Sequence, residues 1–368
     1  MKINNKAIEI LNEIESYGYE AYIVGGAVRD YLLGVQTNDY DITTNMPIEL
    51  LSEKFSILDN GSSYASVTIV ADDNSYEITH FRKDLKYANH RHPEIELVDT
   101  LLEDVKRRDF TINAMALDSN MKLYDFYNGM NDLKNSTIRA IGDPNLRFEE
   151  DALRILRGLH FSSKLGFEIE ENTLKAMVEK KALLNELSHE RIKNYFINII
   201  YSNTANGIDY INKYDLFEYI PVYKGWLKIF NKDMDIKDLD IYYYINYNEY
   251  PPLIKTESKR LIEALKVLID SKFDMYSIYK YQEELKSLFN VISYLNYDII
   301  GIKEILSNLR IKNDNELSLS KADIASYFQG SAKAIAIKEV IKAILEKRID
   351  NNKEQILLFI QGLDVIKC

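Results

Sequence analysis

The sequence predicts an α+β fold, in which a small head with a mixed β-sheet is followed by a long region made only of helices. Short segments of alternating polarity, bounded by Gly, Asn and Asp, fill roughly the first 130 residues and are typical of strands. From Glu149 onward such segments nearly vanish, and apolar residues recur at helical spacing with short breaks near Gly207 and Gly330. The two parts of the chain therefore predict different secondary structure.

The first half of the head alternates between predicted helices and strands. The expected helices are residues 7–14, 28–33 and 47–54, and the expected strands are residues 21–24 and 40–43. Gly25 and Gly26 close the first strand, and Gly34 follows the second helix as a C-terminal cap. Pro47 suits the first turn of the third helix.

The second half of the head begins with a predicted hairpin. Residues 66–70 and 76–79 alternate as two strands around a turn at 72–74. The remaining expected segments are a charged loop at 82–93, a strand at 95–98 and a helix at 111–117.

The composition excludes several classes of protein. Hydrophobic residues make up 46% of the 368 residues and charged residues 28%, which is typical of a globular protein. No apolar run approaches the roughly 18–20 residues of a membrane-spanning helix, so we expect no membrane partner and a cytoplasmic location. Cys368 is the only cysteine, which excludes intramolecular disulfides. The net charge of −11 confines any surface for nucleic acid to a local patch.

Two carboxylates stand one residue apart at the start of the second predicted strand, Asp39 and Asp41. Residues at i and i+2 of a strand point to the same face, so these carboxylates repel each other unless a cation lies between them. Mg²⁺ prefers such oxygen ligands and keeps positions open for substrate phosphates. Glu77, in a neighbouring predicted strand, is the candidate for a third ligand. Taken alone, the pattern is also compatible with a solvated acidic turn.

The segment upstream of this pair, residues 25–30 (GGAVRD), has the features of a phosphate-binding turn. A strand that ends in Gly-Gly and opens a helix lets backbone N–H groups approach phosphate oxygens closely. The same residues are compatible with an ordinary tight turn. In combination with Asp39 and Asp41, they predict a site that holds a triphosphate at a helix N-terminus and its metal ions on the adjacent strand.

Five blocks of sequence resemble, in order, the motifs of one enzyme superfamily. The blocks are residues 25–34 (GGAVRDYLLG), 39–41 (DYD), 107–114 (RRDFTINA), 138–144 (IRAIGDP) and 147–157 (RFEEDALRILR). They are similar to the polymerase-β nucleotidyltransferase superfamily. More narrowly, they resemble the class II tRNA nucleotidyltransferases (CCA-adding enzymes) and the related bacterial poly(A) polymerases.

The resemblance implies a seahorse-like architecture with three parts. These are a nucleotidyltransferase head at 1–135, a helical neck for nucleotide selection at 136–200, and a helical body and tail for tRNA binding at 201–368. It also implies template-independent addition of CCA to the 3′ end of tRNA by two-metal nucleotidyl transfer. The implied partners are tRNA, CTP, ATP and Mg²⁺, with no obligate protein partner evident.

The resemblance also assigns individual site residues. The implied catalytic metal ligands are Asp39, Asp41 and Glu77. The implied nucleotide-binding residues are Gly25, Gly26 and Arg29 for the triphosphate, Arg108, Asp109 and Asn113 for phosphates and ribose, and Asp151 and Arg154 for the base, with Glu150 orienting them and Arg157 nearby.

A single helix over residues 147–157 would place Glu150 and Asp151 beside Arg154, because residues three and four apart share a helix face. A carboxylate can accept from the exocyclic amine of cytosine or adenine while a guanidinium donates to the ring nitrogen. Guanine and uracil place a carbonyl where that amine would be. Such a pair would admit C and A and reject G and U, whereas charge pairs on a surface helix are the alternative interpretation.

Several alternatives remain open. The full-length segment at 82–93 favours complete CCA addition over partial addition of CC or of A alone. Bacterial poly(A) polymerase is the alternative within the family, although its relatives typically carry a basic C-terminal extension. A small-molecule nucleotidyltransferase is the alternative from a different class, but it leaves residues 150–157 and the long helical region unexplained. Tyr195 departs from the family pattern, since an acidic residue is usual there, and this change bears on how its helix is anchored.

Overall fold

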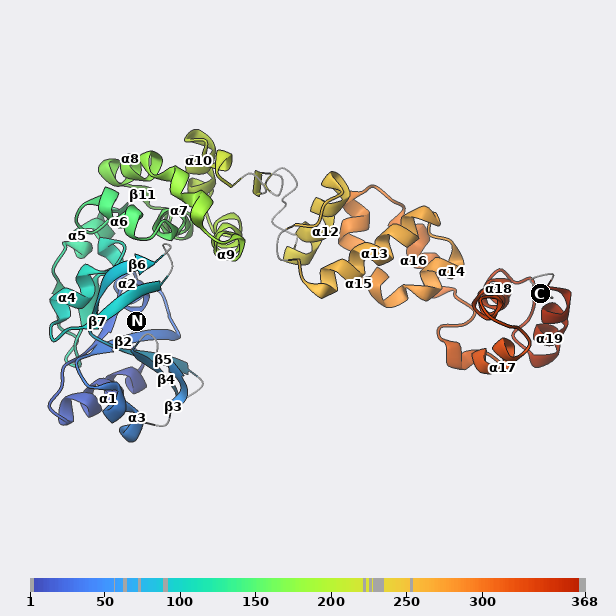
Figure 1. Cartoon of the computed structure of the whole chain (residues 1–368), viewed down its shortest axis with the longest axis horizontal. Coiled ribbons are helices and arrows are strands. Elements are labelled where there is room, and N and C mark those ends of the chain that lie inside the picture. The colour runs from blue at the N-terminus through green and yellow to red at the C-terminus, as the bar shows by residue number, and fades with distance from the viewer. Residues whose placement is uncertain are drawn as a thin grey trace. The chain divides into compact units, whose positions relative to one another are not determined.

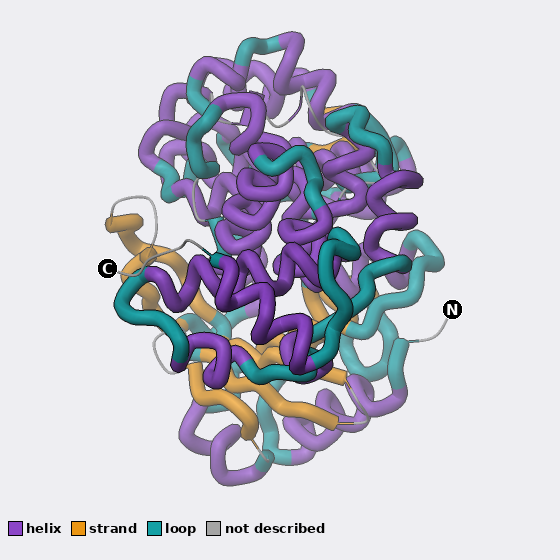
Figure 2. Tube along the Cα trace, turned by 90° about the vertical axis from the view of Figure 1, so that its right-hand side faces the viewer, coloured by secondary structure: helices purple, strands orange, loops and turns teal. Residues whose placement is uncertain are grey.

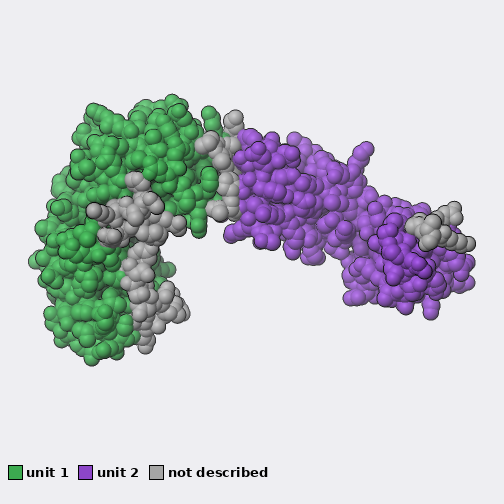
Figure 3. Space-filling model, viewed as in Figure 1, with its two compact units in different colours: residues 1–227 green, residues 228–368 purple. Residues whose placement is uncertain are grey.

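The computed structural model describes residues 3–55, 57–61, 65–71, 74–88, 92–220, 223–224, 227, 235–251 and 254–363. The chain forms two compact units, residues 1–227 and 228–368 (Figure 3). The first unit contains the strands together with helices, and the described part of the second contains helices without strands (Figure 1). The predicted α+β class is confirmed, and the finer division at residues 135 and 200 stays a prediction.

The first unit is built on a seven-stranded mixed sheet. In spatial order its strands are β3 (Ile57–Gly61), β4 (Ser66–Ala71), β5 (Asn74–His80), β2 (Asp39–Thr44), β1 (Ala21–Val24), β8 (Met115–Leu117) and β9 (Leu123–Asp125). The neighbours β2 and β5 run parallel, and the other described neighbours in this sheet are antiparallel. Tyr40 on β2 stacks on Tyr76 on β5 with ring centroids 5.7 Å apart, which ties the parallel pair together.

The helices of the head follow the predicted order. They are α1 (Asn5–Ser16), α2 (Gly26–Leu32), α3 (Ile48–Lys54), α4 (Leu101–Lys106) and α5 (Gly129–Lys134). In α1, Ala7, Leu11 and Ile14 recur at helical spacing and are fully buried. The side chain of Asn4 caps this helix by accepting from the backbone N–H of Lys6. Because α2 follows β1 directly, the predicted glycine turn lies at the junction between them.

The charged segment at 82–93 is not a loop, and this expectation is wrong. It belongs to an antiparallel hairpin of β6 (Arg82–Ala88) and β7 (His92–Leu97), whose turn at 89–91 lies outside the described residues. Lys83 and Glu96 face each other across the hairpin and form an ion pair of 2.9 Å. Cross-strand pairs of charged side chains stabilise these strands without the apolar alternation that predicts a strand from sequence.

The expected helix at 111–117 is also wrong. Residues Thr111–Asn113 form a 3₁₀ turn, and Met115–Leu117 form β8 between β1 and β9. The whole segment is buried. A short run that is buried on all sides has no periodicity that separates a central strand from a helix.

Helices also make up most of the remainder of the first unit. They are α6 (Pro144–Glu150), α7 (Leu153–Leu165), α8 (Glu171–Glu179), α9 (His189–Ile200) and α10 (Asn206–Lys213). Two short parallel strands, β10 (Thr137–Ile138) and β11 (Glu168–Ile169), also lie in this region. Figure 2 shows strands in orange. Helix α7 packs against both α9 and α10.

The second unit has its own hydrophobic core. Its helices are α12 (Ile236–Tyr247), α13 (Thr256–Asp270), α14 (Met275–Lys280), α15 (Gln282–Tyr294), α16 (Ile299–Ser307), α17 (Lys321–Ser326), α18 (Ala332–Leu345) and α19 (Lys353–Gly362). Leu265, Leu288 and Ile344 belong to one buried cluster that joins α13, α15 and α18. Among the described residues, no helix is both long and apolar enough to cross a lipid bilayer.

The contact between α7 and α10 generates a prediction at Gly207. A Cβ there would lie 2.6 Å from the carbonyl oxygen of Leu159 and 2.4 Å from Oγ of Ser163. Gly207→Ala should therefore lower the free energy of unfolding by about 1–3 kcal/mol, as overpacking does elsewhere. Urea unfolding followed by circular dichroism measures the effect. Gly362→Ala is the control, since its Cβ meets no atom within 4 Å, and equal midpoints for the two variants would contradict the packing argument.

Candidate active site

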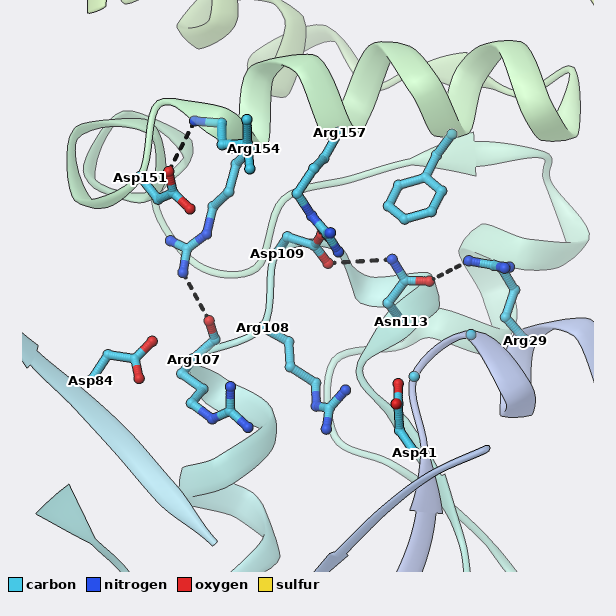
Figure 4. A pocket seen from close by; sticks show the side chains of 14 residues that line it. Arg29, Asp41, Asp84, Arg107, Arg108, Asp109, Asn113, Asp151, Arg154 and Arg157 are labelled. Atoms are coloured by element: carbon cyan, nitrogen blue, oxygen red, sulfur yellow. Dashed lines mark hydrogen bonds and ion pairs between the residues drawn. The ribbon is translucent and has the colours of Figure 1, made fainter. Parts of the chain in front are cut away.

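A cavity of about 410 Å³ lies in the first unit, between the head and α7 (Figure 4). Its walls are Gly25, Gly26, Arg29, Asp41, Asp84, Arg107, Arg108, Asp109, Asn113, Asp151, Leu153, Arg154, Arg157 and Phe161. The structure thus brings together all the predicted site residues except Asp39, Glu77 and Glu150. Five separate segments of the sequence meet here.

The glycine turn forms one wall of the cavity. Gly25 has φ +72°, a backbone conformation that side chains other than glycine rarely adopt. A Cβ at this position would lie 3.1 Å from Oδ2 of Asp41 and 3.2 Å from Nη1 of Arg108. Glycine therefore keeps the space beside a carboxylate and a guanidinium open for a ligand.

The predicted metal ligands share one region of the sheet. Asp39 and Asp41 lie on β2, and Asp41 is directly opposite Glu77 in the parallel pairing with β5. Burial raises the pKa of Asp41; Arg108 opposes this shift, while the charges of Asp39 and Glu77 add to it. Asp39 and Glu77 are exposed and lie outside the cavity walls. The described residues contain no group of three or more His, Cys, Asp or Glu placed to hold a metal ion, so these roles stay a prediction.

A chain of hydrogen bonds crosses the cavity from the head to α7. Nη1 of Arg29 donates to Oδ1 of Asn113 at 2.7 Å, and Nδ2 of Asn113 donates to Oδ1 of Asp109 at 3.3 Å. Oδ2 of Asp109 accepts from Nε of Arg157 at 2.6 Å. Burial by itself raises the pKa of Asp109, but the charge and hydrogen bonds of Arg157 outweigh it and hold this pKa below its ordinary value.

Phe161 is a cavity residue that the sequence motifs did not indicate. Its ring centroid lies 5.2 Å from the guanidinium of Arg29 and 5.4 Å from that of Arg157. Cation–π contacts of this kind fix both guanidiniums against one ring. Phe161 follows Arg157 by one turn of α7, and this spacing is the signal that could have found it.

Tyr195 on α9 contacts the same network. Its hydroxyl accepts a hydrogen bond of 2.8 Å from Nη1 of Arg157. The residue that departs from the family pattern therefore joins α9 to α7 through a neutral oxygen.

Residues 147–157 do not form the single helix that we expected. Helix α6 ends at Glu150, Asp151 is extended with φ −145° and ψ 104°, and α7 begins at Leu153. Oδ1 of Asp151 accepts from the backbone N–H of Leu153 at 3.0 Å, so this side chain starts the new helix. It also accepts from Nη2 of Arg191 at 3.2 Å. The spacing of residues along a helix did not predict this break, because the break depends on the hydrogen bond from the backbone of Leu153 to the side chain of Asp151.

Glu150 pairs with Arg154 as expected, although the helix is interrupted between them. Oε2 of Glu150 accepts from Nη1 of Arg154 at 2.7 Å and from Nη1 of Arg147 at 2.6 Å. The carbonyl oxygen of Arg107 accepts from Nη2 of Arg154 at 2.9 Å. Glu150 does not line the cavity but pairs with Arg154, which does, and its orienting role stays a prediction.

Comparisons with known proteins agree with this geometry. Residues 21–139 match the family described as poly A polymerase head domain, and residues 166–227 match the probable RNA and SrmB-binding site of polymerase A. The chain is 31% identical over 384 residues to the CCA-adding enzyme of Enterococcus faecalis, covering 96% of this chain and 95% of that protein. It is 33% identical over 399 residues to the CCA-adding enzyme of Staphylococcus epidermidis, covering 98% of each.

A solved structure shares the fold along the whole chain. The crystal structure of Bacillus stearothermophilus CCA-adding enzyme in complex with CTP has a TM-score of 0.76 and 25% sequence identity, with 98% of each chain covered. The likeness therefore includes both the head and the helical region.

His160 on α7, beside Tyr195, generates a prediction about pH. Burial and then the nearby cations Lys164 and Arg157 lower the pKa of His160 to about 4. The unfolded state binds a proton near pH 6.5 and the folded state does not, so stability should fall as pH falls from about 6.5 to about 4. His160→Gln should make this loss smaller in urea unfolding at pH 4.5 and 7. The exposed His189→Gln is the control, and an unchanged pH dependence in His160→Gln would contradict the assignment.

Proposed function

The chain belongs to the family of CCA-adding enzymes, and we propose that it adds C, C and A to the 3′ end of tRNA from CTP and ATP without a nucleic-acid template. The observation that carries the proposal is one cavity in which the Gly25 turn, Asp41 and Arg154 meet from three separate segments. Phosphate, metal and base recognition are the three tasks that such a transfer needs at one place.

The triphosphate binds at the start of α2. Gly25 and Gly26 stand at the N-terminus of α2 and line the cavity without a Cβ, and phosphate oxygens accept from their backbone N–H groups. The guanidinium of Arg108 lies beside the same turn and supplies positive charge. Arg29 holds Asn113 in place, and Asn113 with Asp109 offers hydrogen-bonding groups to the ribose.

The base binds against Asp151 and Arg154. An oxygen of Asp151 accepts from the exocyclic amine of cytosine or adenine, and Arg154 donates to the ring nitrogen beside it. Guanine and uracil present a carbonyl to Asp151 and leave that carboxylate without a donor. Glu150 keeps Arg154 in position for this selection, and Arg157 holds Asp109.

Asp39, Asp41 and Glu77 would hold the divalent ions, which we propose are Mg²⁺. The donor set fits, because carboxylate oxygens are its preferred ligands and a cation would offset both the burial and the repulsion by Asp39 and Glu77 that raise the pKa of Asp41. When bound, the ions activate the attacking hydroxyl and offset charge on the leaving oxygens.

In the transfer, the 3′ hydroxyl oxygen of tRNA bonds to the α-phosphorus while the bond to the bridging oxygen of pyrophosphate breaks. The chain's own residues align these atoms and offset developing charge, and no nucleophilic side chain takes part. We further propose that residues 1–135, 136–200 and 201–368 act as catalytic head, nucleotide-selecting neck and tRNA-binding region. The site of action is the cytoplasm.

Asp41→Asn tests the assignment of the carboxylates. We expect nucleotide incorporation to fall by at least about 100-fold, as for other groups that act on charge in a transition state. The affinity for tRNA, measured by filter binding, should not change. Asp99→Asn, an exposed aspartate before α4, is the matched control and should retain activity. An active Asp41→Asn enzyme would refute the metal assignment.

The product tests the activity itself. A tRNA lacking its last three nucleotides should gain two C residues and one A when CTP and ATP are present, and nothing from GTP or UTP. Gel analysis of labelled products distinguishes the alternatives. Long A tails on unrelated RNA would indicate a poly(A) polymerase, and a product that stops after CC would indicate partial addition.

A further inference from the structure

Two arginines of the cavity, Arg107 and Arg108, share one buried partner that does not itself line the cavity. This partner is Asp104 on α4, which is 0% exposed. Its Oδ1 accepts from Nε of Arg107 at 3.0 Å, and its Oδ2 lies 3.4 Å from Nη2 of Arg108. Both guanidiniums reach from the end of α4 toward the cavity (Figure 4).

Asp104 carries a buried negative charge. Burial by itself raises its pKa, but the charges of Arg107 and Arg108 and their hydrogen bonds outweigh this and lower the pKa below its ordinary value. An ionised carboxylate away from solvent needs such partners, and two guanidiniums supply them. The charge is therefore permanent at neutral pH.

Arg108 lies between two carboxylates. On one side is Asp104, and on the other is Asp41, whose pKa the charge of Arg108 lowers. Nη2 of Arg108 is the atom that pairs with Asp104, whereas Nη1 lies on the side of the glycine turn, 3.2 Å from where a Cβ of Gly25 would be. Nη1 is thus the donor that faces a ligand at the glycine turn. Without the charge of Asp104, attraction would draw this guanidinium onto Asp41.

Asp104 also contacts the hairpin. Its Oδ1 accepts from the backbone N–H of Arg82 at 3.3 Å, at the first residue of β6. Two residues further along the same strand, Asp84 lines the cavity. One carboxylate thereby contacts both arginines and the first residue of this strand.

We propose that Asp104 is a positioning residue for the nucleotide, which holds Arg108 at the glycine turn for the triphosphate and away from Asp41. The inference rests on the proposed function, since it takes a nucleoside triphosphate as the ligand. It predicts that Asp104 acts on CTP and ATP through Arg108 and has no direct effect on tRNA.

The test is a double-mutant cycle with purified full-length enzyme. Asp104→Asn should raise the KM for CTP at least about tenfold, as loss of supporting contacts does at other sites, with the KM for tRNA unchanged. It should also raise the Mg²⁺ concentration needed for half-maximal rate, because Arg108 then competes at Asp41. Arg108→Ala should raise the KM for CTP by a similar factor. The double variant should be no worse than Arg108→Ala alone, since Asp104 acts through that side chain.

Asp132→Asn is the matched control. Asp132 is a buried aspartate of the same unit that pairs with Arg139 at 3.1 Å and lies outside the cavity walls. The Asp132→Asn variant should lose thermal stability and keep the KM of the wild type for CTP. If Asp104→Asn does not fold, Asp104→Glu keeps the charge but displaces it, and should raise the KM for CTP in a folded enzyme.

The outcomes distinguish failure of the proposed function from failure of the positioning role. A wild-type enzyme that binds no CTP would refute the proposed function. An active wild type with additive effects of Asp104→Asn and Arg108→Ala, or with an equal rise in the KM for tRNA, would overturn the positioning role. An unchanged KM for CTP in a folded Asp104→Asn or Asp104→Glu would overturn it as well.

Discussion

The ion pair between the buried Asp109 and the partly exposed Arg157 is the interaction on which the site depends. Asp109 belongs to the head and Arg157 to α7, and Nε and Nη2 of Arg157 each lie 2.6 Å from the same carboxylate oxygen. The pair joins the cavity wall formed by the head to the wall formed by α7. Breaking one partner would leave an uncompensated charge in a low-dielectric place, which is costly. The glycine turn and Arg154, which we propose bind the phosphates and the base, therefore stay at a set distance from each other.

The other arginines named in the cavity are also paired with carboxylates of the protein. Arg29 is paired with Asp30, Arg108 with Asp104 and Arg154 with Glu150, so a protein acceptor holds each guanidinium before a ligand arrives. Arginine carries five donors, and pairing with a carboxylate uses only some of them. The ligand then meets groups that are already oriented and has little ordering cost to offset. An acidic protein can in this way present a local cluster of cations to a polyanion.

Much of this arrangement could be predicted from sequence, and the exceptions have separate physical causes. The junction at Gly25, the strand with Asp41 and the block around Asp109 were predictable because local patterns determine them. The hairpin at 82–97, the strand at 115–117 and the break at Asp151 were not, because cross-strand charges, burial between β1 and β9, and a side-chain bond to the backbone decide them. Asp104 was not predicted although Arg107 and Arg108 lie three and four residues away, because its burial depends on packing that no local pattern shows.

The parallel pairing of β2 with β5 has a consequence for how the enzyme is made. Antiparallel neighbours can be joined by a tight turn, but parallel ones need a crossing connection, here α3, β3 and β4. The carboxylates of Asp41 and Glu77 therefore come together only after that whole connection has been synthesised and its ends have closed. A nascent chain that stops before β5 exposes an incomplete acidic edge, so the proposed metal-binding pair cannot form until Glu77 has left the ribosome.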